Sequence, residues 1–134
     1  MFPPKPPKGA DPRMYFFLFL LTLGTTLGYQ GWTLLYTNFA VESAHLSAAD
    51  NGLVQSLREV PGLLGFLIIP LLLVMKEHRV AAVAALATGL GTALTGFFPS
   101  FVPVILTTLL MSFGFHFFEA VNQSLLLQYF DVRT

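Results

Sequence analysis

The chain has 134 residues and a formal net charge of zero, and 54% of its residues are hydrophobic while only 10% are charged. Soluble domains carry about 25% charged residues, so this composition excludes an ordinary soluble globular protein. The neutral charge balance lacks the basic excess that a nucleic-acid partner requires. Because the chain has no cysteine, disulfides, thiol nucleophiles and cysteine-bound metals are excluded as well.

Two long uncharged runs cover residues 14–41 and 80–118. A bilayer crossing needs about 20 mostly apolar residues, so each run can cross at least once. The first run is far longer than the apolar region of a signal peptide, about 7–15 residues, and we interpret it as a retained span. The sequence therefore predicts an integral membrane protein whose first partner is the lipid bilayer.

Residues 1–13 carry five of the nine prolines and are predicted to form a flexible, proline-rich cytoplasmic leader. Residues 14–134 are predicted to form the transmembrane segment. Its first helix covers about 14–40 and ends at a polar loop. The second covers about 50–75 and begins between Ser47 and Asn51, because Ser47 and Asp50 have the spacing of a capping box.

The second uncharged run is too long for one crossing. As a single helix it would extend ~58 Å, about twice the hydrocarbon thickness. Prolines at 99 and 103 mark the break, which predicts a third helix over about 80–98 and a fourth over about 101–128. No strand pattern occurs. The expected fold class is all-α, a polytopic membrane bundle of four transmembrane helices.

The positive-inside rule predicts that both termini are cytoplasmic. The expected location is the cytoplasmic membrane of the cell. With this orientation no Lys or Arg falls on the outer side. The inner side holds six such residues: Lys5, Lys8, Arg13, Lys76, Arg79 and Arg133.

Polar side chains form stripes on the first and fourth helices at 100° per residue. A carboxylate inside a membrane costs ~2.5–3.5 kcal/mol, so these stripes are predicted to face the bundle interior or water. Two interpretations stay open: the stripes line a cavity, or they bond to their own backbone and to neighbouring helices. With Arg58 of the second helix, the predicted cavity residues are Thr26, Tyr29, Thr33, Tyr36, Arg58, Ser112, His116, Glu119 and Gln123.

Three further patterns bear on the site. Gly24, Gly28 and Gly31 share the opposite side of the first helix and predict close helix packing, as do the small residues of the third helix. Arg58 and Glu59 are adjacent, so we expect them to face different surroundings. His116 and Glu119 have metal-ligand spacing, but a di-metal bundle needs further carboxylates and a second such pair, so no metal or cofactor is expected.

The chain resembles the N-terminal part of a major facilitator superfamily transporter over about residues 14–131. The resemblance is carried by LGYQGWTLLYTNFAVE, LSAADNGLVQSLREVPGLLGFLIIP and GFHFFEAVNQSLLL. It implies that the four helices belong to a six-helix half, that helices one and four line a central cavity, that helix two flanks it and that helix three lies outside. The family's loop motif, G-x-x-x-D-R-x-G-R-R/K, matches residues 70–79 only at Arg79, and the arginine that often opens the family's fourth helix is missing.

The sequence therefore predicts part of a secondary active transporter that moves a small solute by alternating access, completed by the rest of the transporter or by other subunits. Its substrate stays open among sugars, drugs and organic anions. Glu119 is expected either to couple transport to protons, with His116 as a relay, or to be a fixed counter-charge for a cationic solute or for an arginine on another helix.

Other functions were weighed against the transporter. One alternative is a stand-alone four-helix accessory or assembly protein in which the polar stripes hold helices together. A small multidrug pump would need a carboxylate in the first helix, and residues 14–41 have none. An enzyme is not expected, because the chain lacks a Ser/His/Asp set, a thiol and a phosphate-binding loop.

Overall fold

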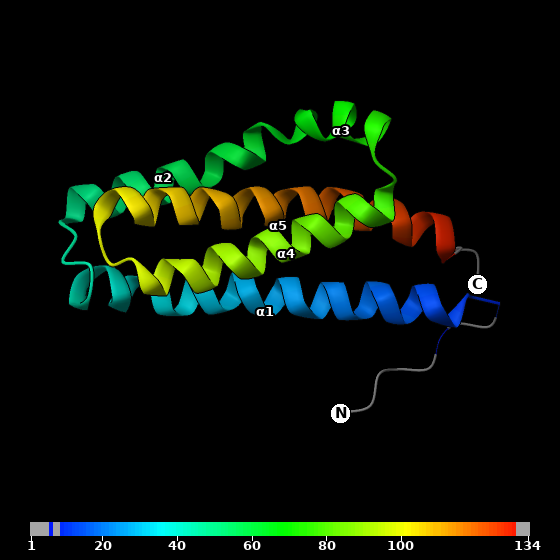
Figure 1. The fold of residues 1–134 in the computed structure, drawn as a ribbon, viewed down its shortest axis with the longest axis horizontal. Helices are drawn as coiled ribbons and strands as arrows, with labels where there is room; N and C mark the ends of the chain where they lie inside the picture. The colour runs from blue at the N-terminus through cyan, green and yellow to red at the C-terminus, as the bar shows by residue number, and fades with distance from the viewer. Residues whose placement is uncertain (1–5, 7–8, 131–134) are drawn as a thin grey trace.

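The computed structural model describes residues 6 and 9–130, and nearly all of them are helical, with no strand among them (Figure 1). The all-α class is thus confirmed. The elements in chain order are α1 (Pro12–Glu42), α2 (Ala48–Leu63), a 3-10 turn η1 (Gly65–Leu67), α3 (Ile68–Val74), α4 (Glu77–Phe97) and α5 (Phe101–Tyr129).

Local capping explains where the helices begin. Asp11 accepts a hydrogen bond from the Arg13 N–H, and Pro12 occupies the first turn of α1. Ser47 and Asp50 form the capping box that the sequence predicts at the start of α2, with the Asp50 N–H donating to Ser47 Oγ at 3.1 Å. Most of the leader predicted over residues 1–13 lies outside the described residues.

The helix expected over 50–75 is not continuous. It is broken after Leu63 into α2 and a second piece, η1 with α3, and the two pieces are bent by 45°. Pro61 lacks an N–H and weakens the helix just before the break. One turn before Pro61, the Arg58 carbonyl accepts a hydrogen bond from Ser112 Oγ of α5, so a neighbouring helix supports the bent segment.

The membrane-spanning capacity of the helices differs. Among the described residues, α4 and α5 are long and apolar enough to cross a membrane, and the bent pair of α2 with η1 and α3 adds a third candidate. Large apolar side chains on these helices face outward, including Leu73, Val74 and Leu106. This is the surface of a membrane protein, because soluble proteins rarely expose contiguous apolar patches of this kind.

The bundle is built on close contact between α4 and α5. A Cβ added to Gly114 of α5 would lie 2.5 Å from the Ala84 carbonyl oxygen of α4, so the two backbones meet where Gly114 has no side chain. Helix α1 packs along α4 and α5, and Thr92 of α4 donates a hydrogen bond to the Gly28 carbonyl of α1. Helix α2 packs on α5 (Figure 1).

Two apolar clusters fill the interior, one toward each end of the bundle. The cluster at the end that carries the first residues of α1 contains Leu18, Val80, Ala81, Ala84, Phe118, Val121 and Leu125. The cluster at the opposite end contains Trp32, Tyr36, Ala40, Val54, Val104 and Met111. Between these clusters the facing sides of α1 and α5 are polar, and this is where the candidate site lies.

Candidate functional site

A groove of about 320 Å³ runs between α1 and α5, and its walls are polar at most positions. No residue of α2, α3 or α4 lines it. Helix α1 contributes Thr22, Thr25, Thr26, Tyr29 and Gln30, and α5 contributes Phe115, Phe118, Glu119, Asn122 and Gln123. We call this the α1–α5 groove.

Helical periodicity explains why these ten side chains meet. On α1 the lining positions recur at intervals of three, four, seven and eight residues from Thr22, and on α5 at the same intervals from Phe115. Residues with that spacing share one face of a helix. Each helix thus presents a single face to the groove, and the two faces oppose each other.

Four of the nine predicted cavity residues are brought together here: Thr26, Tyr29, Glu119 and Gln123. Glu119 and Gln123 are exposed, as is Thr26, while Tyr29 is half-buried. Tyr29 stacks on Phe115 with ring centroids 3.8 Å apart and an interplanar angle of 13°. This aromatic pair joins α1 to α5 within the groove wall.

The predicted stripe on α1 does not continue along the groove. Thr33 is exposed and donates to the Tyr29 carbonyl, as a hydroxyl in a helix commonly does. Tyr36 is 2% exposed and stacks on Trp32 in an apolar cluster that also contains Val54 of α2. Tyr36 instead belongs to a cluster formed with residues of α2 and α5, and periodicity within α1 cannot reveal such packing.

Arg58 lies outside the groove. Its Nε and Nη2 donate to Glu59 Oε1 at 2.9 and 2.6 Å, and its guanidinium lies 5.4 Å from the centroid of the Trp32 ring. The two side chains thus meet in an ion pair, although their surroundings differ, since Arg58 is 20% exposed and Glu59 is 58% exposed. Adjacent Cβ atoms point apart, but the long arginine side chain reaches back to its neighbour.

Ser112 and His116 face α2 instead of the groove. Ser112 Oγ donates to the Arg58 carbonyl, and a Cβ added to Gly62 would lie 3.1 Å from His116 Cε1. No hydrogen bond or ion pair joins His116 to Glu119 in the described part of the chain. The predicted stripe on α5 is thus divided between two neighbours.

Several groove residues were missed by the sequence interpretation. Thr25 and Asn122 line the groove, and Thr25 Oγ1 and Asn122 Oδ1 are buried without a hydrogen-bond partner among the described residues. Gln30, Thr22 and Phe115 were missed as well. The recurrence of polar residues at three, four, seven and eight positions after Thr22 is the signal that finds most of them.

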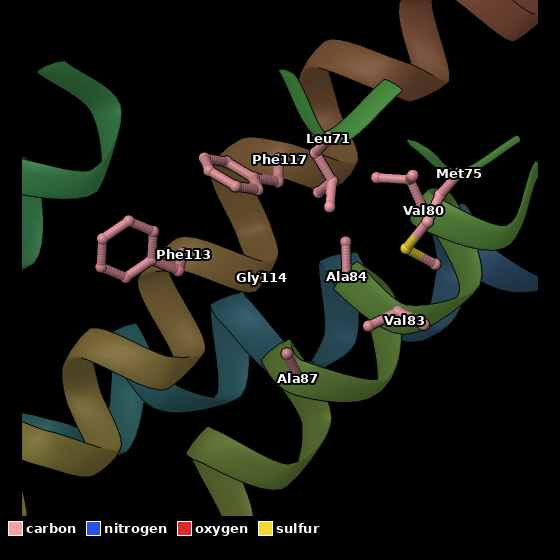
Figure 2. Close-up of a pocket in the computed structure, with 9 residues that line it drawn as sticks. All are labelled: Leu71, Met75, Val80, Val83, Ala84, Ala87, Phe113, Gly114 and Phe117. Carbon is pink, nitrogen blue, oxygen red and sulfur yellow. The ribbon is translucent and has the colours of Figure 1, made fainter. Parts of the chain in front are cut away.

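A second cleft is entirely apolar. It encloses about 150 Å³ between α3, α4 and α5 and is lined by Leu71, Met75, Val80, Val83, Ala84, Ala87, Phe113, Gly114 and Phe117. Figure 2 shows Phe113 and Phe117 of α5 on one side and Val83, Ala84 and Ala87 of α4 on the other. With no polar side chain, this cleft offers no chemistry for a polar solute.

Residues 6 and 9–130 contain no group of three His, Asp or Glu side chains that could bind a metal ion. No protein-family model, curated protein or solved structure matches this chain. The resemblance to major facilitator transporters accordingly stays a prediction from the sequence, and the function rests on the groove itself.

Proposed function

We propose that this chain is part of a secondary transporter that moves a small solute by alternating access, with the α1–α5 groove on the path of the solute. The observation that carries the proposal is the groove itself. It is a polar surface that contains the Glu119 carboxylate, and it lies between two helices whose other exposed side chains are largely apolar. A carboxylate facing lipid would cost ~2.5–3.5 kcal/mol, so water, solute or other protein must cover this face.

The membrane arrangement is part of the proposal. We propose four spans: α1, the bent segment made of α2, η1 and α3, then α4, and finally α5. The protein lies in the cytoplasmic membrane, and both termini are in the cytoplasm. Secondary transporters bind substrate near the bilayer midplane between repeats. In this arrangement the rest of the transporter, or other subunits, faces the groove from the far side.

The proposal is tested by solvent access to the groove. The chain has no cysteine, so single cysteines can be introduced without removing native ones. Thr26→Cys places a thiol in the groove. Leu27→Cys places one at nearly the same depth but outside the groove, at a residue that is 65% exposed. In native membranes a charged, membrane-impermeant thiol reagent is expected to modify Thr26→Cys much faster than Leu27→Cys.

The alternative function, an accessory protein whose polar stripes hold helices together, predicts the opposite. If another helix fills the groove permanently, Thr26→Cys is as unreactive as Leu27→Cys, and the transporter proposal is wrong. Gln123→Ala separates the two functions further. A transporter variant keeps normal amounts of folded protein and loses uptake across a solute panel, whereas loss of a helix-joining contact lowers the amount of folded protein.

A further inference from the structure

The α1–α5 groove is lined by one acidic residue and by no basic residue. Glu119 is the only acidic residue among its ten lining residues, and none of them is Lys, Arg or His. Within the described ranges the one ion pair joins Arg58 to Glu59, and the Arg58 guanidinium lies over Trp32, away from the groove. The groove therefore contains one carboxyl group, and no described lining residue supplies a counter-charge for it.

The position of His116 bears on what Glu119 does. A proton relay between these residues would need the imidazole next to the carboxylate, but the ring packs against Gly62 of α2 and does not line the groove. The groove around Glu119 instead contains hydroxyl, amide and aromatic groups. This surrounding suits recognition of a solute more than transfer of a proton to histidine.

Two buried oxygen atoms lie in the wall of the groove, beside the exposed Glu119. Thr25 is 1% exposed, and its Oγ1 has no hydrogen-bond partner in residues 6 and 9–130; the same holds for the buried Oδ1 of Asn122. Buried polar atoms in proteins are nearly always hydrogen-bonded, but these two have less than 1 Å² exposed, so they belong to the wall of the groove and are not open to a solute. The group that is open to a solute is the Glu119 carboxylate, which accepts hydrogen bonds and has no donor of its own when ionised.

We infer that the groove takes an organic cation, an ammonium-bearing solute whose positive group lies against Glu119. This inference rests on the proposed function. The carboxylate supplies the counter-charge, and the stacked rings of Tyr29 and Phe115 add electron-rich aromatic surface that attracts cations. Organic anions, which the sequence left open, are rejected by the same carboxylate.

The test compares two probes of similar shape and opposite charge. Benzyltrimethylammonium and benzylsulfonate are titrated as protectants of Thr22→Cys, a thiol in the groove, against the membrane-impermeant reagent. The cation is expected to protect at a concentration at least about tenfold lower than the anion, because the carboxylate attracts the one probe and repels the other. Because the ammonium is quaternary, protonation of the probe plays no part.

Variants in the Thr22→Cys background assign the preference to Glu119. Glu119→Gln is expected to remove the tenfold preference, while Glu119→Asp and the control Glu42→Gln, at the exposed end of α1, retain it. Equal protection by both probes, or a preference that survives Glu119→Gln, overturns the inference. If Thr22→Cys does not react at all, the groove is closed to water and the proposed function fails instead.

Discussion

Two glycines determine how closely α4 and α5 approach. A Cβ added to Gly114 would lie 2.5 Å from both the Ala84 carbonyl oxygen and the Thr88 amide nitrogen. A Cβ added to Gly91 would collide with the backbone of Met111. In lipid, helices associate largely through such close packing, because there is no hydrophobic drive between them. The absent side chains of these residues are therefore what lets the two helices pack.

Gly91→Ala and Gly114→Ala are expected to destabilise the bundle by about 1–3 kcal/mol or more each, because the added methyl forces the two backbones apart. Gly89→Ala is the matched control on α4, since a Cβ there meets nothing within 4 Å. Unfolding of the purified protein in detergent measures the difference. Equal stability of all three variants would contradict the role assigned to these contacts.

At the scale of residues, sequence periodicity found part of the site. Thr26, Tyr29, Glu119 and Gln123 were predicted because each lies on a polar face of its helix. Periodicity places a residue on a face but does not say which helix covers that face. For this reason the buried position of Tyr36 in an apolar cluster, and the contact of His116 with Gly62, could not be predicted.

At the scale of elements, the cap of α2 is a local feature with a measurable effect. Ser47 Oγ accepts from the Asp50 N–H, and the Asp50 carboxylate accepts from the Ser47 N–H in return. Ser47→Ala removes one half of this capping box and is expected to cost about 1 kcal/mol. Ser56→Ala, which removes only an exposed bond to the Gly52 carbonyl, is expected to change stability by less. Similar losses in both variants would show that the cap adds nothing.

The contact between α5 and the bent second span gives another prediction. Ser112→Ala removes the hydrogen bond to the Arg58 carbonyl and is expected to destabilise the protein by about 1 kcal/mol. Thr108→Val is the control four residues earlier on α5, because the buried Thr108 hydroxyl has no hydrogen-bond partner in the described part of the chain. A loss at Thr108→Val as large as that at Ser112→Ala would contradict this assignment.

The ends of the elements were predictable and the bend was not. The first, third and fourth helices, expected over 14–40, 80–98 and 101–128, occur at Pro12–Glu42, Glu77–Phe97 and Phe101–Tyr129. Charged loops, caps and prolines mark those ends locally. The break after Leu63 has no such unique signal, because prolines occur inside membrane helices both with and without breaks and the outcome depends on what the neighbouring helix supplies.

At the scale of the whole molecule, α1 is the element on which the proposed topology depends. It has 31 residues, long enough to reach ~46 Å, but it is not among the helices whose composition alone marks them as spans. Its polar positions between Thr22 and Gln30 line the groove opposite α5, while Leu27, Leu34 and Leu35 are exposed. A helix with a polar face toward a groove and an apolar face outward can cross a membrane when the groove is covered by water or protein.

Thiol labelling at the two ends of α1 tests this crossing and its direction. Ser43→Cys, at the exposed C-terminal end of α1, is expected to react with an impermeant maleimide on intact cells. Gly9→Cys, just before α1, is expected to react only after the membrane is permeabilised, because the positive-inside rule predicts that the N-terminal side is cytoplasmic. The reverse pattern would invert the orientation. Labelling of both positions from the same side would show that α1 does not cross the membrane, and the proposed solute path between α1 and α5 would then be wrong.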